Sequence, residues 1–242
     1  MSLTLSVHLL TLHILLFLPS VSYADGICSP DIITRLKNTG AFKDAPHGSP
    51  NHIILNEYLP GQGIMPHEDG PAYHPAVATI SLGSHAIFHY YQYKTDDETE
   101  PEDGALRRQT ADAENSHNPL RASEGRAVDP TPVLTVLLEP RSVVITTGEF
   151  YRSHLHGISE VSEDLLIPGG TDDMAPHVVV PMRVELGAGA AETRLPIANW
   201  KLVSGDNYRA GGCLKRGTRH SLTCRDVVRV SRATPAASFI LR

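Results

Sequence analysis

The stretch GIMPHEDGPAYH, residues 63–74, places a histidine and a carboxylate two positions apart, His67 and Asp69. Side chains at i and i+2 of an extended backbone point to the same face, so these two groups can hold one cation together. A third ligand must come from another segment, and YRSHLHGI offers His154 and His156 on a single strand face. Two histidines and one carboxylate with open coordination positions are typical of non-haem Fe(II) oxygenases. The alternative is a polar turn with two solvated side chains.

The segment RHSLTCR near the C-terminus adds two cations. In a strand, Arg219 and Arg225 project from one face together with Ser221 and Thr223. A buried arginine needs an anionic partner, because an unpaired buried charge is very costly. A small dicarboxylate provides one through bidentate pairing. Six strand residues span about 20 Å, so either both arginines lean towards a common ligand or one of them supports the metal-binding carboxylate. An edge strand with solvated arginines is the other interpretation.

The elements that position these residues are mainly strands. Residues 29–40 predict a helix, with Ser29 as N-cap and Gly40 at its end. Short β-branched or aromatic segments separated by Gly or Pro predict strands at 51–59, 76–83, 84–93, 132–138, 141–148 and 219–230. The fourth and fifth of these suggest a hairpin that turns at Glu139-Pro140-Arg141. Many short strands at close spacing favour an antiparallel sandwich or barrel.

Two long segments interrupt the strands. Residues 94–130 hold ten acidic and five basic residues and almost no large apolar groups. Such a composition predicts a disordered loop, and it accounts for most of the formal net charge of -6. Residues 159–212 either add a hairpin or lengthen a loop. The three cysteines contain no C-x-x-C pair, which argues against a disulfide framework and a structural zinc module.

The first 28 residues differ from the rest and are predicted to be an apolar leader. Residues 1–24 are apolar in the middle and end in Ser22-Tyr23-Ala24, which suits a signal-peptidase site. They contain no Lys or Arg, and Thr, His and Ser interrupt the apolar run, so a stable transmembrane span is not expected. On these residues alone, a cleavable secretory signal is favoured.

The combination NEYLPGQGIMPHED, LHGI and RHSLTCR resembles the AlkB branch of the Fe(II)/2-oxoglutarate dioxygenases. YLPGQGIMPHEDGPAYHP, ISLGSH and LLEPRS are similar to the sixth of the animal AlkB homologues and to its fungal relatives. The family motifs N-x-Y, H-x-D, H-G-I and R-x5-R match, in this order, Asn56 with Tyr58, His67 with Asp69, His156, and Arg219 with Arg225. The resemblance covers residues 29–158 and 213–233.

This resemblance implies a mainly β fold with flanking helices, a double-stranded β-helix or jelly-roll barrel, in residues 29–242. It implies an enzyme that binds Fe(II) through His67, Asp69 and His156, and it selects His156 over His154. 2-Oxoglutarate and O₂ are the implied co-substrates. The same resemblance implies that Arg219, helped by Tyr58, pairs with the distal carboxylate of 2-oxoglutarate. It implies that Asn56 and Arg225 steady the metal-side carboxylate.

The implied reaction is oxidative demethylation or dealkylation of nucleic acid and, as a second option, of protein. DNA or RNA is thus the expected partner of a monomeric enzyme, although no clear basic stripe is present in the sequence. The alternatives are an inactive metal-binding jelly-roll module and a cupin-like metal enzyme that does not use 2-oxoglutarate. The first arises because relatives carry several dozen residues before this region that build part of the substrate lid.

The resemblance also bears on the leader. A dioxygenase of this type works where Fe(II) stays reduced and 2-oxoglutarate is supplied, which predicts the nucleus and cytoplasm. A mistaken first exon would give an apolar, uncharged run joined abruptly to family sequence, as in residues 1–24. If the leader is a genuine signal, the secretory pathway is the alternative.

Overall fold

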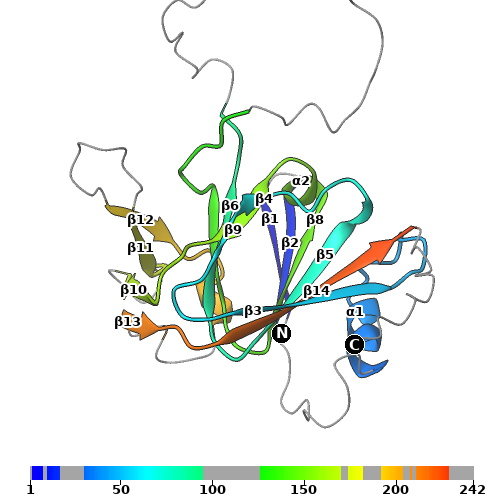
Figure 1. Cartoon of the computed structure of the whole chain (residues 1–242), viewed down its shortest axis with the longest axis horizontal. Helices are drawn as coiled ribbons and strands as arrows, with labels where there is room; N and C mark the ends of the chain where they lie inside the picture. Colours follow the sequence, from blue (N-terminus) through cyan, green and yellow to red (C-terminus); the bar gives the residue numbers. More distant parts are fainter. Residues whose placement is uncertain are drawn as a thin grey trace, which may run out of the picture.

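Ten strands form two facing sheets in the computed structural model, which describes residues 2–7, 10–16, 30–94, 126–169, 174–181, 192–203, 208 and 211–228. The larger sheet has the order β1 (Ser2–Val7), β2 (Leu10–Leu16), β8 (Ser142–Thr147), β5 (Tyr73–Leu82), β14 (Arg219–Val227) and β3 (His52–Tyr58). The smaller has the order β4 (Ile64–His67), β9 (Leu155–Ile158), β6 (Ala86–Tyr91) and β7 (Leu134–Leu138). All of these neighbours pair antiparallel (Figure 1).

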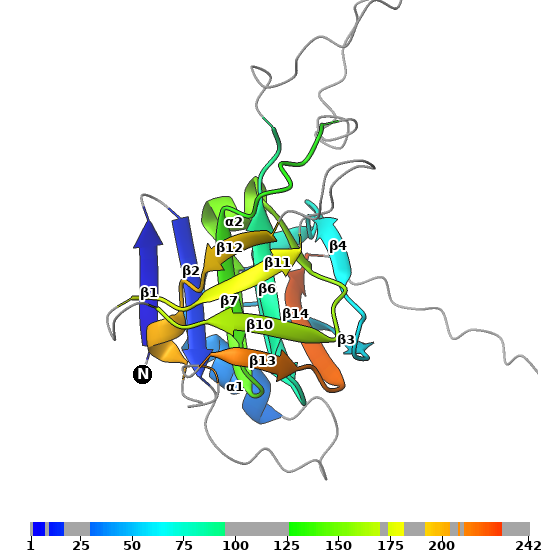
Figure 2. The ribbon, with the colours of Figure 1, turned by 90° about the vertical axis from the view of Figure 1, so that its left-hand side faces the viewer.

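A third antiparallel sheet lies against the outer face of the smaller one. Its order is β12 (Glu192–Pro196), β11 (His177–Pro181), β10 (Glu163–Ile167) and β13 (Gly212–Lys215). Figure 2 shows these strands crossing in front of β6 and β7. The helices are α1 (Pro30–Asn38), α2 (Gly148–Arg152) and the short 3₁₀ helix η3 (Trp200–Leu202). Among the helices that the structure describes, none has the length and apolar character needed to cross a bilayer.

Alternating side chains of the strands fill three apolar layers. On β6, Phe88 and Tyr90 face the interior between the two main sheets, whereas Ile87 packs under the third sheet. On β14, Leu222 and Cys224 pack towards α1, which covers the outer face of the larger sheet. The other face of β14, with its two arginines, therefore points into the barrel. The strand period of 2 fixes this choice.

The predicted fold class is confirmed, because the described residues are mainly β and the sheets are antiparallel. The predicted helix corresponds to α1, and each of the six predicted strand segments contains a strand: β3, β5, β6, β7, β8 and β14.

The predicted hairpin at Glu139-Pro140-Arg141 is wrong. β7 pairs with β6 and β8 pairs with β5, so the chain crosses from one sheet to the other at this turn. Arg141 takes a left-handed backbone, with φ 66°, and its N–H donates to the Ser81 carbonyl 2.6 Å away. Both strands are buried on both faces, and such strands appear as continuous apolar runs without the alternation that reveals a partner.

For residues 159–212 the sequence left open a hairpin or a longer loop. The structure places three strands there, β10, β11 and β12, one more than a hairpin needs. Of the predicted loop at 94–130, residues 95–125 lie outside the described residues. Its ends are joined by a bridge between Tyr93 and Val128 and by the hydrogen bond from Lys94 N–H to the Ala127 carbonyl, 2.8 Å.

The leader is described only in part. Its residues 2–7 and 10–16 form an antiparallel pair, and the second of these strands pairs with β8 at the edge of the larger sheet. Whether residues 1–28 are a signal or a gene-model artefact stays a prediction.

The turn between β5 and β6 holds the chain that leads into β14. Gly83 has φ 81°, and a Cβ there would lie 2.4 Å from the Thr218 carbonyl oxygen. Next to it, Ser84 Oγ accepts a 2.8 Å hydrogen bond from the Gly217 N–H. This close approach fixes the backbone just before Arg219.

We expect Gly83→Ala to destabilise the protein more than Gly61→Ala does. Both glycines have left-handed backbones, and a Cβ at Gly61 would meet nothing within 4 Å. Gly61→Ala should therefore lower the free energy of unfolding by the backbone term alone, about 1–2 kcal/mol. Gly83→Ala should add an overpacking term of about 1–3 kcal/mol. Urea unfolding of both variants measures the difference, and equal losses would show that the turn does not press on residue 218.

Candidate active site

The two histidines of the predicted metal site face each other across neighbouring strands. His67 on β4 is the register partner of His156 on β9, and their ring centroids lie 4.4 Å apart. His67 Nδ1 lies 2.8 Å from the Met65 carbonyl oxygen, which only accepts hydrogen bonds. The proton therefore sits on Nδ1, and Nε2 is left as a ligand nitrogen.

Asp69 lies in the loop after β4, next to His156. Its side chain is 4% exposed, and Arg225 of β14 donates to Oδ1 in a charge-assisted hydrogen bond. Its other oxygen, Oδ2, lies 3.9 Å from His156 Nε2. That separation is too long for a hydrogen bond. It is within reach of one cation bound at about 2.0–2.2 Å from each atom.

Aromatic packing buries His156. Phe88 stacks on its ring, with centroids 5.2 Å apart and an interplanar angle of 18°, and Tyr90 lies edge-on at 6.4 Å. Burial lowers the pKa of His156 to about 4, against the opposing charge of Asp69. The imidazole is therefore neutral at pH 7, which is the form that binds metal ions.

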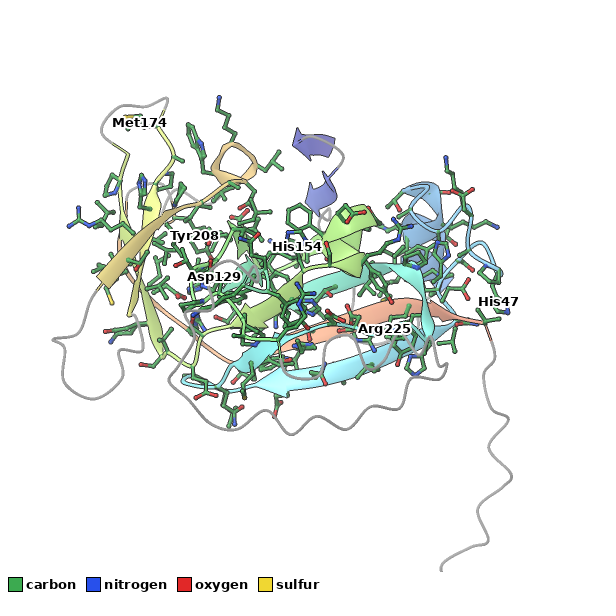
Figure 3. All side chains as sticks on the ribbon, turned by 90° about the horizontal axis from the view of Figure 1, so that it is seen from above. His47, Asp129, His154, Met174, Tyr208 and Arg225 are labelled. Carbon is green, nitrogen blue, oxygen red and sulfur yellow. The ribbon has the colours of Figure 1, made fainter. Side chains whose placement is uncertain are left out.

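His154 belongs to another environment, beside α2 in Figure 3. Its Nδ1 lies 3.1 Å from both the Glu149 carbonyl and Ser153 Oγ, and its ring packs on Phe150 at 4.9 Å. The structure thus brings His156, and not His154, to His67 and Asp69.

The two arginines of β14 divide their tasks. Arg225 pairs with Asp69, and its guanidinium lies 4.6 Å from the centre of the Tyr73 ring. Arg219 faces a separate small pocket at the other end of the strand. The geometry therefore favours the interpretation in which one arginine, Arg225, supports the carboxylate of the predicted metal site, and not the one in which both arginines bind a common ligand.

Arg219 is a buried cation without a carboxylate among the described residues. It is 4% exposed, and its Nη2 donates to Ser81 Oγ at 2.9 Å. Its guanidinium lies 5.4 Å from the ring centre of Tyr58, its register partner on β3. Within the described chain, Arg219 Nε has no hydrogen-bond partner. Burial lowers the pKa of Arg219 to about 10, so it remains charged at pH 7.

The pocket of Arg219 adjoins the histidine pair through β9. Its walls are Tyr58, Leu59, Gln62, His85, Ala86, Ile158, Arg216, Gly217 and Arg219. Ile158 lies two residues beyond His156, so the two side chains share a face of β9. A ligand bound to Arg219 therefore lies on the side of the barrel where the histidines meet.

For Asn56, no side-chain hydrogen bond to another described residue supports the predicted role. Asn56 is the register partner of Ser221 on β14, and within the described residues no side-chain hydrogen bond joins it to Asp69. Among the described residues, Arg225 is the side chain that donates a hydrogen bond to this carboxylate.

Other residues around the site were not predicted. Tyr93 OH donates to Glu68 Oε1 at 3.0 Å, and Tyr151 OH donates to the Gly70 carbonyl at 2.7 Å, so two tyrosines hold the loop that carries Asp69. Phe88, the stacking partner of His156, was accessible to prediction, because it alternates with Tyr90 along a predicted strand. The tyrosine contacts had no sequence signal, since they join segments far apart in the chain.

The side chains fit Fe(II) by their chemistry. Two imidazoles and one carboxylate, held by a backbone carbonyl, a stacked ring and an arginine, form a recognised set for this ion. Among the described residues, no group of three or more His, Cys, Asp or Glu side chains is spaced as an already formed metal cage. The close pairs are His67 with His156 and His156 with Asp69.

Comparisons with known proteins agree with this chemistry. The profile of the 2OG-Fe(II) oxygenase superfamily matches residues 27–225. The chain is 33% identical over 183 residues to the Danio rerio "Probable RNA/DNA demethylase ALKBH6", which covers 76% of this chain and 56% of that protein. It is 46% identical over 66 residues to "Uncharacterized protein L905" of Acanthamoeba polyphaga mimivirus, covering 27% of this chain and 31% of that one. A solved structure of OsALKBH1 aligns with 81% of this chain and 60% of its own, at 18% identity and a TM-score of 0.33.

The chain therefore belongs to the 2OG-Fe(II) oxygenase superfamily. The AlkB-like character predicted from the motifs is confirmed. The chain spans a little over half the length of the Danio rerio relative.

The Arg225–Asp69 pair makes a prediction about stability. Removing one partner of a buried ion pair costs about 3–5 kcal/mol, because the other charge stays behind. We expect Arg225→Met to lower the free energy of unfolding by this amount in metal-free protein, and Asp69→Asn/Arg225→Met to recover most of the loss. A double-mutant cycle by urea unfolding measures the coupling. If the effects of the two substitutions on the free energy of unfolding are additive, Asp69 and Arg225 are not coupled and the prediction is wrong.

Proposed function

We propose that this protein is an Fe(II)- and 2-oxoglutarate-dependent dioxygenase that oxidatively removes alkyl groups, methyl groups among them, from nucleic acid. The observation that carries the proposal is the buried, carboxylate-free Arg219 in a pocket that adjoins the His67–His156 pair. A cupin-like metal enzyme has no use for this cation, whereas a dicarboxylate co-substrate needs it.

In this proposal His67, Asp69 and His156 hold Fe(II). Bound Fe(II), together with 2-oxoglutarate and O₂, would supply the hydroxylation of a C–H bond of the substrate. The chain's own part is to hold and orient. The Met65 carbonyl sets the tautomer of His67, Phe88 fixes the plane of the His156 ring, and Arg225 holds Asp69.

Arg219 binds the distal carboxylate of 2-oxoglutarate, and Tyr58 flanks it. Nε is buried and has no partner among the described residues, and with the planar guanidinium it gives Arg219 a donor for a carboxylate oxygen. Asn56 is assigned to the metal-side carboxylate by resemblance alone.

The substrate class rests on similarity. The Danio rerio relative is named a probable RNA/DNA demethylase, and this chain is 33% identical to it over 183 residues. We extend that substrate class to this protein. A protein substrate and an inactive metal-binding module are the remaining candidates, and turnover assays with methylated DNA, RNA and peptide separate them.

We further propose that the protein acts as a monomer in the nucleus and cytoplasm. The support is chemical: Fe(II) must stay reduced and 2-oxoglutarate must be supplied, and Cys213 is a free thiol, which suits a reducing compartment.

The metal assignment is tested by two alanine variants. Asp69→Ala should abolish tight Fe(II) binding and 2-oxoglutarate decarboxylation, because it removes the one anionic ligand. His154→Ala is the matched control and should keep both, since this side chain bonds to α2. Anaerobic titration with Fe(II) and 2-oxoglutarate, followed by the metal-to-ligand charge-transfer band, is the measurement. Normal iron content and turnover in Asp69→Ala would refute the assignment.

The co-substrate assignment is tested at Arg219. Arg219→Ala leaves a buried carboxylate of 2-oxoglutarate unpaired, which costs about 2–5 kcal/mol. The KM for 2-oxoglutarate should therefore rise more than about tenfold. Arg219→Lys keeps the charge but lacks the planar fork, so it should restore little of the affinity. Steady-state decarboxylation measures both, and an unchanged KM in Arg219→Ala would make β14 purely structural.

A further inference from the structure

A second buried arginine lines the same pocket, three residues before Arg219. Arg216 is 8% exposed, and its Nε and Nη2 donate to the two oxygens of Asp164, each at 2.7 Å. This is a bidentate ion pair, the strong geometry for arginine and carboxylate. The third donor, Nη1, binds the Ser159 carbonyl at 2.8 Å.

Asp164 is the centre of this cluster and comes from the third sheet. It lies on β10, is 4% exposed, and also accepts a 3.1 Å hydrogen bond from His85 Nε2. Burial alone raises the pKa of Asp164, but the hydrogen bonds from His85 and Arg216 outweigh burial and hold it below its usual range. Asp164 is therefore a carboxylate at neutral pH.

The pairing decides which charges face the pocket. Three basic side chains line it: His85, Arg216 and Arg219. Asp164 accepts from the first two, so among the described lining residues Arg219 is the one cation without a carboxylate partner. Burial lowers the pKa of Arg219 most, and the positive charge of Arg216 lowers it further. The two guanidinium groups therefore interact electrostatically across the pocket.

We propose that Asp164 is a specificity-determining residue of the co-substrate pocket: its ion pair with Arg216 removes a second cation and leaves a site for one singly charged carboxylate. This inference rests on the proposed function, because it assumes that the pocket takes the distal carboxylate of 2-oxoglutarate. Without the Asp164 charge, Arg216 becomes available, and the pocket favours an anion of higher charge.

The test compares two probes that differ in one end group. Glutarate and 4-phosphonobutyrate both carry a carboxylate and a three-methylene chain, but the second ends in a phosphonate of higher charge. Their affinities for the full chain without added metal are measured by isothermal titration calorimetry. Asp164→Asn should shift the ratio of the two affinities about tenfold towards the phosphonate, or about 1.4 kcal/mol.

Two control variants separate the effect of losing the Asp164 charge from a general disturbance of the structure. Glu163→Gln removes the same charge from the neighbouring, exposed position of β10 and should leave the ratio unchanged. Asp164→Leu/Arg216→Met removes both charges, and such apolar replacements of a buried pair often preserve stability. This double variant should return the ratio to that of the wild-type protein.

The outcomes are distinct. If the wild-type chain binds neither probe, the proposed co-substrate pocket fails. If it binds and Asp164→Asn folds with an unchanged ratio, the role of Asp164 is overturned. If Asp164→Asn does not fold, the Arg216→Gln variant tests the proposal instead. It leaves the negative charge of Asp164 unpaired beside the pocket, where it repels a bound anion. It should weaken glutarate binding about tenfold, and the Asp164→Leu/Arg216→Met variant should regain it. No recovery in the double variant would overturn the proposal.

Discussion

The inward face of β14 sets the constraint on which the rest of the site depends. β14 lies between β3 and β5, with neighbours on both sides, so Arg219 cannot reach water along a free edge. A buried guanidinium must be met by an anion or by well-placed acceptors. At one end of the strand Arg225 meets Asp69, and at the other end Arg219 meets a hydroxyl and an aromatic ring. The first contact orients Asp69, a proposed metal ligand. The second leaves Arg219 without a carboxylate among the described residues, so an anionic ligand could pair with it.

The three proposed metal ligands, His67, Asp69 and His156, are each held in place by a neighbouring group. His156 is held by stacking on Phe88, and burial keeps its ring neutral. His67 is oriented by a backbone carbonyl, which cannot change its role as acceptor. Asp69 supplies the carboxylate: Arg225 binds one of its oxygens, and the other lies 3.9 Å from His156 Nε2. The three proposed ligands are thus oriented by groups outside the proposed ligand set.

Local patterns predicted the parts of this structure that depend on local physics. The period of 2 placed Arg219 and Arg225 on one face, opposite Leu222 and Cys224, and the structure has them so. Partnership between strands was not predictable in the same way. β7 and β8 are buried on both faces, so their sequences look alike whether they form a hairpin or cross between sheets. His156 was distinguished from His154 by a family motif, because both lie at the same strand period.

The sheet formed by β10, β11, β12 and β13 was not predicted from the sequence. It contacts the segment that leads into β14. Only residues 216–218 separate β13 from β14, and within them Arg216 bonds to Asp164 of β10 while Gly217 N–H bonds to Ser84. These contacts join three sheets at one short segment, just before Arg219. A shift of β10 relative to the barrel would pull on Arg216 and so change the charge that faces the pocket. Through Asp164, the third sheet therefore holds Arg216 in the wall of the Arg219 pocket, although the sequence left open whether residues 159–212 form a hairpin or a longer loop.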